Sequence, residues 1–116
     1  MKTLNLTNHL ATPEQRCSEP TNKKEVQDLL TFHSLPSKEE VADRANRLAL
    51  LAVREGATSA LLGGAPYLMS VLERALKTAG VTPVYSFTER MSEETTAADG
   101  SVTKTNVFKH VGWVEV

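Results

Sequence analysis

Three polar side chains of types that handle phosphate esters follow strand-like apolar runs. Asn8 and His9 come after residues 3–7, and Arg90 comes after residues 81–87. An imidazole titrates near neutral pH and can transfer a proton, and a guanidinium can hold two phosphate oxygens. We therefore predict that Arg90 holds the non-bridging oxygens, Asn8 orients the ribose or phosphate, and His9 shuttles a proton. The alternatives are a loop histidine bonded to backbone and an exposed hairpin arginine.

Two glycines join the apolar run 59–62 to a helical pattern. Gly63 and Gly64 are followed by Ala65 and Pro66. Glycine lets the backbone approach a ligand closely, and proline suits the first helical position. A helix N-terminus after a parallel strand is where open α/β sheets bind anions. We expect these four residues to bind a phosphate or ribose, and a bulkier residue at Gly64 to weaken binding more than folding. The alternative is that the turn needs glycine for steric reasons alone.

Signatures of several other enzyme classes are missing from the sequence. The three histidines (His9, His33, His110) and Cys17 lack the spacing of zinc ligands. The chain has no P-loop, no dinucleotide fingerprint and no G-x-S-x-G elbow. We therefore expect neither a metal nor a cofactor. Cys17 is the only cysteine, which excludes an intrachain disulfide and fits a reducing cytoplasm.

Composition and charge narrow the range of partners. The chain has 116 residues, which suits one domain over residues 1–116. Its formal net charge of −1 offers no basic field for long nucleic acid. No apolar stretch approaches the ~20 residues of a membrane span, and the first residues lack the features of a signal peptide. We expect a cytoplasmic protein that contacts no membrane.

Helical and strand patterns alternate over the first three quarters of the chain. Strands are predicted at residues 3–7, 59–62 and 81–87, and a weaker one at residues 30–33. Helices are predicted from Pro13, from the cap Asn22 to Leu30, from the cap Ser37 to Gly56, and over residues 66–79. Two core faces are predicted, namely Val41, Ala45, Leu48, Ala49, Ala52 and Val53, and Leu68, Val71, Leu72, Ala75 and Leu76. Short connections between alternating elements are typical of a parallel sheet with helical crossovers.

The last quarter has the pattern of a β-hairpin. Two β-rich runs flank Asp99 and Gly100, a strong turn signal, so we predict an antiparallel hairpin from about residue 81 to 116 that closes one edge of the sheet. Strict alternation places Lys109 on the face of Trp113 and His110 on the opposite face. Lys104, Asn106 and His110 are further candidates for ligand contact. The alternative for Lys109 and His110 is that each is a charge on an edge strand that prevents aggregation.

The predicted strands bring the candidate residues to one edge of the sheet. Parallel strands end at the same edge, where ligands bind in a crevice at a topological switch point. The groups expected there are Asn8 and His9, then Ser37, then residues 63–66, then Thr88 to Arg90. The predicted fold is α/β, with a Rossmann-like, mostly parallel sheet flanked by helices and a C-terminal antiparallel hairpin.

Six segments carry a resemblance to a known family: LNLTNH (4–9), TPEQ (12–15), GGAPYLM (63–69), VTPVY (81–85), DGSV (99–102) and NVFKHV (106–111). On these the chain resembles a small family of CRISPR-ancillary proteins of type III systems, ring-nuclease-like relatives of the CRISPR-associated Rossmann fold (CARF). The resemblance implies one CARF-like domain, and a homodimer that binds a cyclic oligoadenylate, cyclic tetra-adenylate, at its interface.

The resemblance also implies a reaction. A ribose 2′-hydroxyl attacks the adjacent phosphate without a metal, leaves a 2′,3′-cyclic phosphate, and so switches off type III CRISPR signalling. Such chemistry needs in-line geometry, charge on the phosphate oxygens and one general acid or base. Two alternatives stay open. One is a protein that sequesters the messenger without cleaving it, and the other is a structural or interaction subunit whose glycines only permit packing.

Overall fold

The computed structural model describes residues 2–116, and every side chain among them except those of residues 91, 93 and 105–107. The elements follow one another as β1 (Thr3–Leu6), the 3₁₀ turn η1 (Pro13–Gln15), α1 (Lys23–Leu30), α2 (Lys38–Arg54), β2 (Ser59–Leu62), α3 (Pro66–Thr78), β3 (Thr82–Thr96) and β4 (Val102–Glu115). No helix in the described part of the chain is long and apolar enough to cross a membrane.

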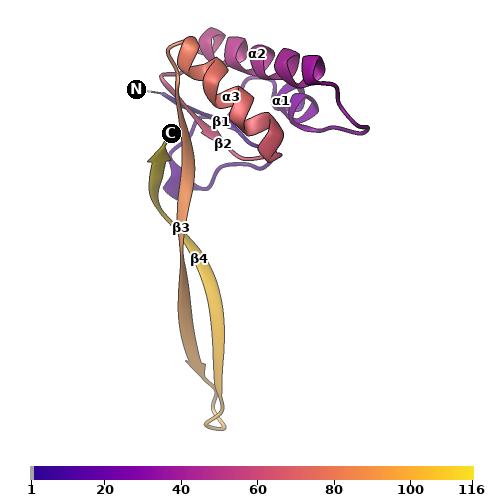
Figure 1. Ribbon diagram of the computed structural model, residues 1–116. Helices are drawn as coiled ribbons and strands as arrows, with labels where there is room; N and C mark the ends of the chain where they lie inside the picture. Colours follow the sequence, from indigo (N-terminus) through magenta and orange to yellow (C-terminus); the bar gives the residue numbers. More distant parts are fainter. Residues whose placement is uncertain (1) are drawn as a thin grey trace.

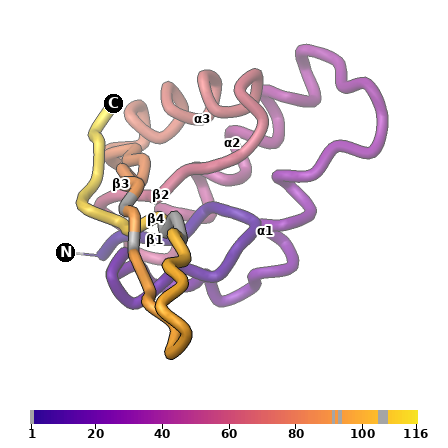
Figure 2. Tube along the Cα trace, turned by 90° about the horizontal axis from the view of Figure 1, so that it is seen from below, coloured from indigo at the N-terminus to yellow at the C-terminus, as the bar shows by residue number. Residues whose placement is uncertain are grey.

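The strands form a mixed α/β sheet in the order β1-β2-β3-β4. The first three are parallel, with Leu4 opposite Ala60 and Leu61 opposite Val84, and β4 pairs antiparallel with β3. A topological switch point needs a reversal in the order of the strands. The order here is sequential, so the prediction of a switch point is wrong. Right-handed crossovers in a single direction place their helices on one face, where Figures 1 and 2 show α2 and α3.

The core lies between that face of the sheet and the helices. Leu4 and Leu62 of the strands pack with Leu48 of α2 and Leu72 of α3, all of them buried. The two predicted helical faces supply most of this core. The exception is Val53, which is 47% exposed, whereas Leu51 is buried beside Thr21, Asn22 and Glu25 at the start of α1. The apolar stripe of α2 therefore turns toward α1 at its end.

The strand predicted over residues 30–33 is wrong. Leu30 ends α1, and the chain continues as a loop to α2. Arg44 of α2 donates hydrogen bonds to the carbonyls of Asp28 and Thr31, and its guanidinium lies 4.1 Å from the centre of the Phe32 ring. A cation at a helix C-terminus satisfies carbonyls that the helix leaves open. These carbonyls are thus taken by a side chain rather than by a neighbouring strand.

The hairpin is confirmed over the predicted range, but its first strand continues well beyond its predicted end at residue 87. Only Thr82 to Val84 of β3 pair with β2, and β3 continues to Thr96. At the turn, Gly100 has a φ of 86° and the Asp99 carboxylate accepts from the Ser101 N–H at 2.9 Å. The far part of the hairpin, residues 88–110, projects from the rest of the molecule (Figure 1). We term it the arm and the remainder the head.

A β-bulge in β4 changes which hairpin residues share a face. Phe87 pairs with Gly112, but Thr88 pairs with His110, so Val111 is an extra residue. His110 therefore lies on the face of Trp113, with the two ring centres 6.3 Å apart. The strict alternation predicted from the sequence is wrong at this point, because a bulge shifts every later residue by one position.

Candidate functional site

A crevice of about 530 Å³ opens at the carboxyl ends of β1 and β2, beside β3. We term it the crevice, and it is lined by Thr7, Asn8, His9, Leu10, Thr12, Gln15, Leu61, Leu62, Gly63, Gly64 and Ser86. The structure thus brings together Asn8, His9, Gly63 and Gly64, which lie more than 50 residues apart in the sequence. The sheet does so because parallel strands end at one edge.

Asn5 shapes the wall of the crevice, and sequence reasoning missed it. This residue of β1 is 0% exposed. Its amide nitrogen donates to the His9 carbonyl at 2.7 Å and to both Glu19 oxygens at 3.0 Å, and its oxygen accepts from the Thr7 backbone and hydroxyl. A buried amide needs such partners. The signal available in the sequence was a lone amide between two leucines of a predicted strand.

Side chains of α1 bind the backbone of the loop that carries Asn8 and His9. The Lys23 ammonium donates to the carbonyls of Thr7 at 2.7 Å and His9 at 3.0 Å, and the Gln27 amide donates to that of Asn8 at 3.1 Å. The backbone oxygens of residues 7–9 are therefore engaged by the head. The side chains of Asn8 and His9 are exposed, so both are available to a ligand in the crevice.

Glu19 anchors this network as an anion. Burial raises the pKa of its carboxyl, but hydrogen bonds from the Ala11 N–H, Asn5 and Lys23, with the charge of Lys23, lower the pKa overall. The Lys23 ammonium lies 3.2 Å from the Glu19 carboxylate. Favourable contacts to the charged form outweigh desolvation here. The loop that carries Asn8 and His9 is therefore tied to an ionised side chain.

The two glycines differ in what surrounds them. A Cβ at Gly63 would lie 3.3 Å from the Cγ2 of Thr7, which lines the crevice, whereas one at Gly64 would lie 3.2 Å from the Cε of Met69 and 3.8 Å from Leu30. Gly64 thus abuts two core side chains, which favours the alternative that this position of the turn needs glycine for steric reasons. Gly63 is the glycine whose side-chain direction meets the wall of the crevice.

Ala65 and Pro66 are not among the residues that line the crevice. Pro66 begins α3, and Ala65 precedes it without a side-chain cap. Ser37 also lies elsewhere, because its hydroxyl caps α2 by accepting from the Glu40 N–H at 3.1 Å. It lines a second pocket of about 630 Å³ together with Phe32, Leu35 and Tyr67.

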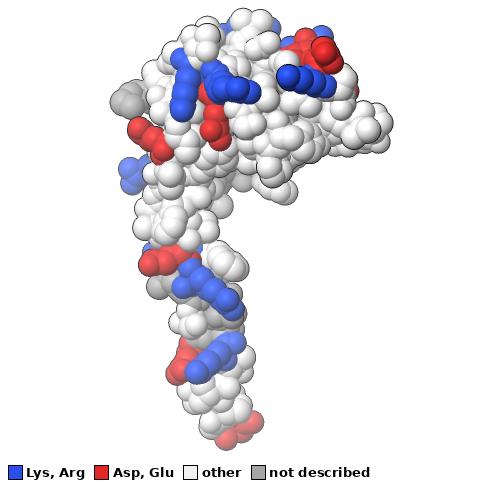
Figure 3. Space-filling model, in the orientation of Figure 1, with Lys and Arg blue, Asp and Glu red and all other residues white. Residues whose placement is uncertain are grey.

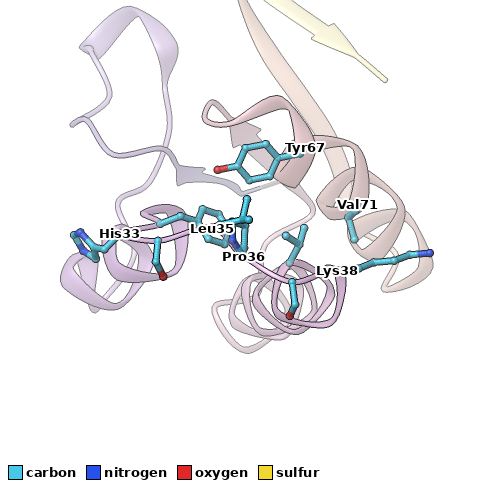
Figure 4. Close-up of a pocket in the computed structure, with 10 residues that line it drawn as sticks. His33, Leu35, Pro36, Lys38, Tyr67 and Val71 are labelled. Atoms are coloured by element: carbon cyan, nitrogen blue, oxygen red, sulfur yellow. The ribbon is translucent and has the colours of Figure 1, made fainter.

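The second pocket is apolar and remote from the arm. The Phe32 and Tyr67 rings meet edge to face with their centres 5.4 Å apart. In Figure 4 the Tyr67 ring is directed toward the middle of the pocket, whereas His33 and Lys38 extend away from it. Figures 1 and 2 place the loop of residues 31–37 at the end of the head that is opposite the arm. Ser37 therefore does not join Asn8 and His9.

The remaining candidates lie on one face of the arm. Pairing of Thr88 with His110, Arg90 with Phe108 and Glu94 with Lys104 puts these six residues on the face of Ser86. Ser86 lines the crevice, and its hydroxyl is 2.5 Å from the Nδ1 of His110. The side chain of Asn106, which the register places opposite Ser92, lies outside the described residues.

Arg90 does not reach the crevice of its own chain. It lies four residues beyond Ser86 on an extended strand, which is roughly 13 Å, and it is not among the lining residues. The predicted cluster of Asn8, His9 and Arg90 is therefore not assembled within one chain. No Lys, Arg, Asp or Glu is present among the residues that line the crevice. In Figure 3 the corner between head and arm shows only uncharged residues, whereas both signs of charge follow the arm.

Two observations complete the chemical description of the site. Within the described residues, no group of three or more His, Cys, Asp and Glu side chains is arranged to hold a metal ion. Burial raises the pKa of the Cys17 thiol to about 11, with a smaller effect of the Glu19 charge. At neutral pH this thiol is protonated, so Cys17 is a poor nucleophile.

Comparison with known proteins yields one family. Residues 1–114 match the family described as the uncharacterized protein MJ1673 family. No curated protein and no solved structure matches the chain significantly.

Proposed function

The chain belongs to the uncharacterized protein MJ1673 family, and we propose that it binds a cyclic oligoadenylate, cyclic tetra-adenylate, in the crevice and cleaves it. In this proposal the domain is a relative of the CARF proteins that it resembles, and the cleavage switches off type III CRISPR signalling. The observation that carries the proposal is the meeting of Asn8, His9, Gly63 and Gly64 in one crevice at the carboxyl ends of parallel strands.

The size of the crevice supports a shared ligand. A volume of about 530 Å³ lies within the range of sites for one drug-sized molecule, which corresponds to one or two nucleotides of the ring. A ring of four nucleotides then extends beyond a single crevice. A two-fold homodimer offers the same crevice twice, and a two-fold symmetric ring matches it.

The exposed His9 supports the chemical step. In that step the 2′-hydroxyl loses its proton to an imidazole while its oxygen attacks the adjacent phosphorus. The O2′–P bond forms, the P–O5′ bond breaks, and the leaving 5′-oxygen takes up a proton. The products carry a 2′,3′-cyclic phosphate and a 5′-hydroxyl. General acid or base catalysis of this kind contributes typically ~10²–10⁴ in rate, and Asn8 beside His9 would orient the attacking ribose.

The direct test is incubation of the purified protein with cyclic tetra-adenylate in EDTA, followed by chromatography of the products. We expect linear products with a 2′,3′-cyclic phosphate. In single-turnover reactions, His9→Ala and Asn8→Ala should cleave about 10²-fold more slowly or worse, and His33→Ala, an exposed histidine at the second pocket, should match the parent protein. Parental rates for His9→Ala, Asn8→Ala and Arg90→Ala would overturn the assignment of the reactive residues.

Sequestration without cleavage is the second candidate, and one observation favours it. The lining of the crevice within one chain holds no cation, and in such catalysis the stabilisation of a developing charge commonly contributes more than any other effect. The same experiment separates the two functions, because a sequestering protein retains intact cyclic tetra-adenylate. A protein that neither binds nor cleaves the ring would instead favour a structural role.

A further inference from the structure

The arm is built like an element that needs a second surface. Phe87 at its base is 54% exposed and Phe108 on the opposite face is 73% exposed. A two-stranded hairpin alone is at best marginally stable in water, and β4 is an edge strand of the described sheet. The radius of gyration is 17.5 Å, against about 13 Å for a compact domain of this length. The arm therefore has exposed aromatic side chains and a free strand edge that another surface can cover.

The arm also carries charge that the crevice lacks. Arg90 and Lys104 lie on the face of Ser86. Lys104 is matched by Glu94 across the hairpin at 3.6 Å, whereas Arg90 forms no ion pair with any of the described side chains. A guanidinium without a carboxylate partner is suited to phosphate oxygens.

We propose that two copies of this chain associate so that the arm of each lies against the crevice of the other, where the partner's Arg90 completes the anion site. The ligand chemistry in this inference rests on the proposed function. A guanidinium strengthens the binding of a phosphate ligand. No Lys or Arg of the same chain is among the residues that line the crevice, and Arg90 lies roughly 13 Å beyond Ser86. If a two-fold axis relates the two chains so that their arms run side by side in opposite directions, the Arg90 of each chain lies at the crevice of its partner.

The shape of the chain and the area of the arm fit such a pair. Head and arm form an L (Figure 1), and two such shapes close on one another with both crevices facing the space between them. Nine residues per strand make the arm about 30 Å long, and two strands make it about 10 Å wide, so one face covers about 300 Å². A symmetric dimer contains two such contacts, and each contact buries surface on both chains. The total buried area is then about 1,200 Å², the lower limit for a stable interface.

A mixed dimer tests the sharing of the site. Each single variant, His9→Ala and Arg90→Ala, should lose about 10²-fold in the rate of cleavage of cyclic tetra-adenylate as a homodimer. A dimer with one chain of each kind, isolated through two affinity tags, should regain about half of the parental rate, because one of its two sites is intact. An inactive mixed dimer would mean that both residues act within one chain, and would overturn the inference. If the protein binds the ring without cleaving it, the same comparison is made on the number of bound ligands.

Cross-linking tests the placement of the arm without any ligand. In a Cys17→Ser background, Leu10→Cys at the exposed rim of the crevice and Arg90→Cys should form a disulfide between chains, seen as a dimer band on a non-reducing gel. Leu10→Cys with Lys24→Cys on α1, and each single-cysteine variant, should remain monomeric on the gel. If the Leu10→Cys/Arg90→Cys protein gives no dimer beyond these controls, the arm placement is wrong even where cyclic tetra-adenylate binds. A dimer band from this variant, together with a parent protein that binds no cyclic tetra-adenylate, would refute the proposed function and leave the placement of the arm standing.

Discussion

At the scale of single residues, the crevice depends on a few side chains that never face it. Asn5 and Lys23 donate to the carbonyls of Thr7 and His9. Glu19 in turn accepts from Asn5, Lys23 and the Ala11 N–H. Removing one member of such a hydrogen-bond network lowers the stability of the fold, because each polar group that loses its partner stays desolvated without a hydrogen bond. The exposed Asn8 and His9 are therefore presented on a loop whose conformation is determined from the interior.

Acid should weaken this network through Glu19. Its carboxyl pKa is lower in the folded chain than the unfolded value of about 4.3, so its charge stabilises the fold above that pH, and the contribution is lost as the pH falls through the folded pKa. Urea unfolding at a series of pH values should show that Glu19→Gln is less stable than the parent at pH 7, and that the difference shrinks as the pH falls below the unfolded pKa of about 4.3. A difference that is constant with pH would contradict the ionic role of Glu19.

At the scale of elements, the turn between β2 and α3 serves both packing and the crevice. The two glycines that follow β2 differ in what a side chain would contact. A Cβ at Gly63 would lie near Thr7, and one at Gly64 would lie near Met69 and Leu30. Ser37, which was predicted at the edge of the sheet, instead lies in the loop between α1 and α2 and acts as a helix cap. Adjacent positions in a turn can therefore have separate roles.

Substitution of the two glycines should separate stability from binding. Gly64→Val places branched carbons against the core side chains of Met69 and Leu30 and should lower the free energy of unfolding by about 1–3 kcal/mol. Gly63→Val meets Thr7 at the wall of the crevice and should cost less stability but weaken binding of cyclic tetra-adenylate. Denaturant unfolding and titration of the folded protein measure the two effects. The opposite order, with Gly63→Val the less stable and Gly64→Val the weaker binder, would show that the geometry of the turn has been misread.

At the scale of the whole molecule, the head and the arm differ in how they are stabilised. The head has a core shared by three strands and the helices, whereas in the arm, a twisted ribbon, none of the side chains that the structure describes is buried. A ribbon that exposes aromatic side chains and a long strand edge tends to associate. The association state of the chain is therefore expected to depend on the arm.

Shortening the arm should abolish association and leave the head folded. Thr88 and His110 are paired across the hairpin, so residues 89–109 can be replaced by Asn-Gly, which favours a two-residue turn. Light scattering after gel filtration should report a dimer for the full chain and a monomer for this variant, with cooperative thermal unfolding retained.

The matched control removes only the tip. Replacement of residues 95–103 by Asn-Gly between the paired Glu94 and Lys104 keeps Arg90 and Phe108, and this variant should remain a dimer. A full-length chain that is monomeric at micromolar concentration, or a shortened chain that still dimerises, would refute the role of the arm.

Much of the secondary structure follows from local signals in the sequence. The caps Asn22 and Ser37 start α1 and α2 where predicted, the run 59–62 is β2, and Asp99 and Gly100 form the hairpin turn. These signals work because caps, turns and periodic apolar faces depend on residues within a few positions of one another. The meeting of Asn8 and His9 with Gly63 and Gly64 was also predictable, because parallel strands end at one edge.

Long-range packing decided the rest. Four features depend on partners elsewhere in the chain. They are the bulge at Val111, the position of Arg90 beyond the crevice, the burial of Asn5 and the absence of a strand at residues 30–33. Strand pairing sets which residues oppose one another and how far a hairpin continues, and a shift of one residue reverses the faces. The types of side chain at the site were therefore present in the sequence, whereas their division between head and arm was set only by the tertiary structure.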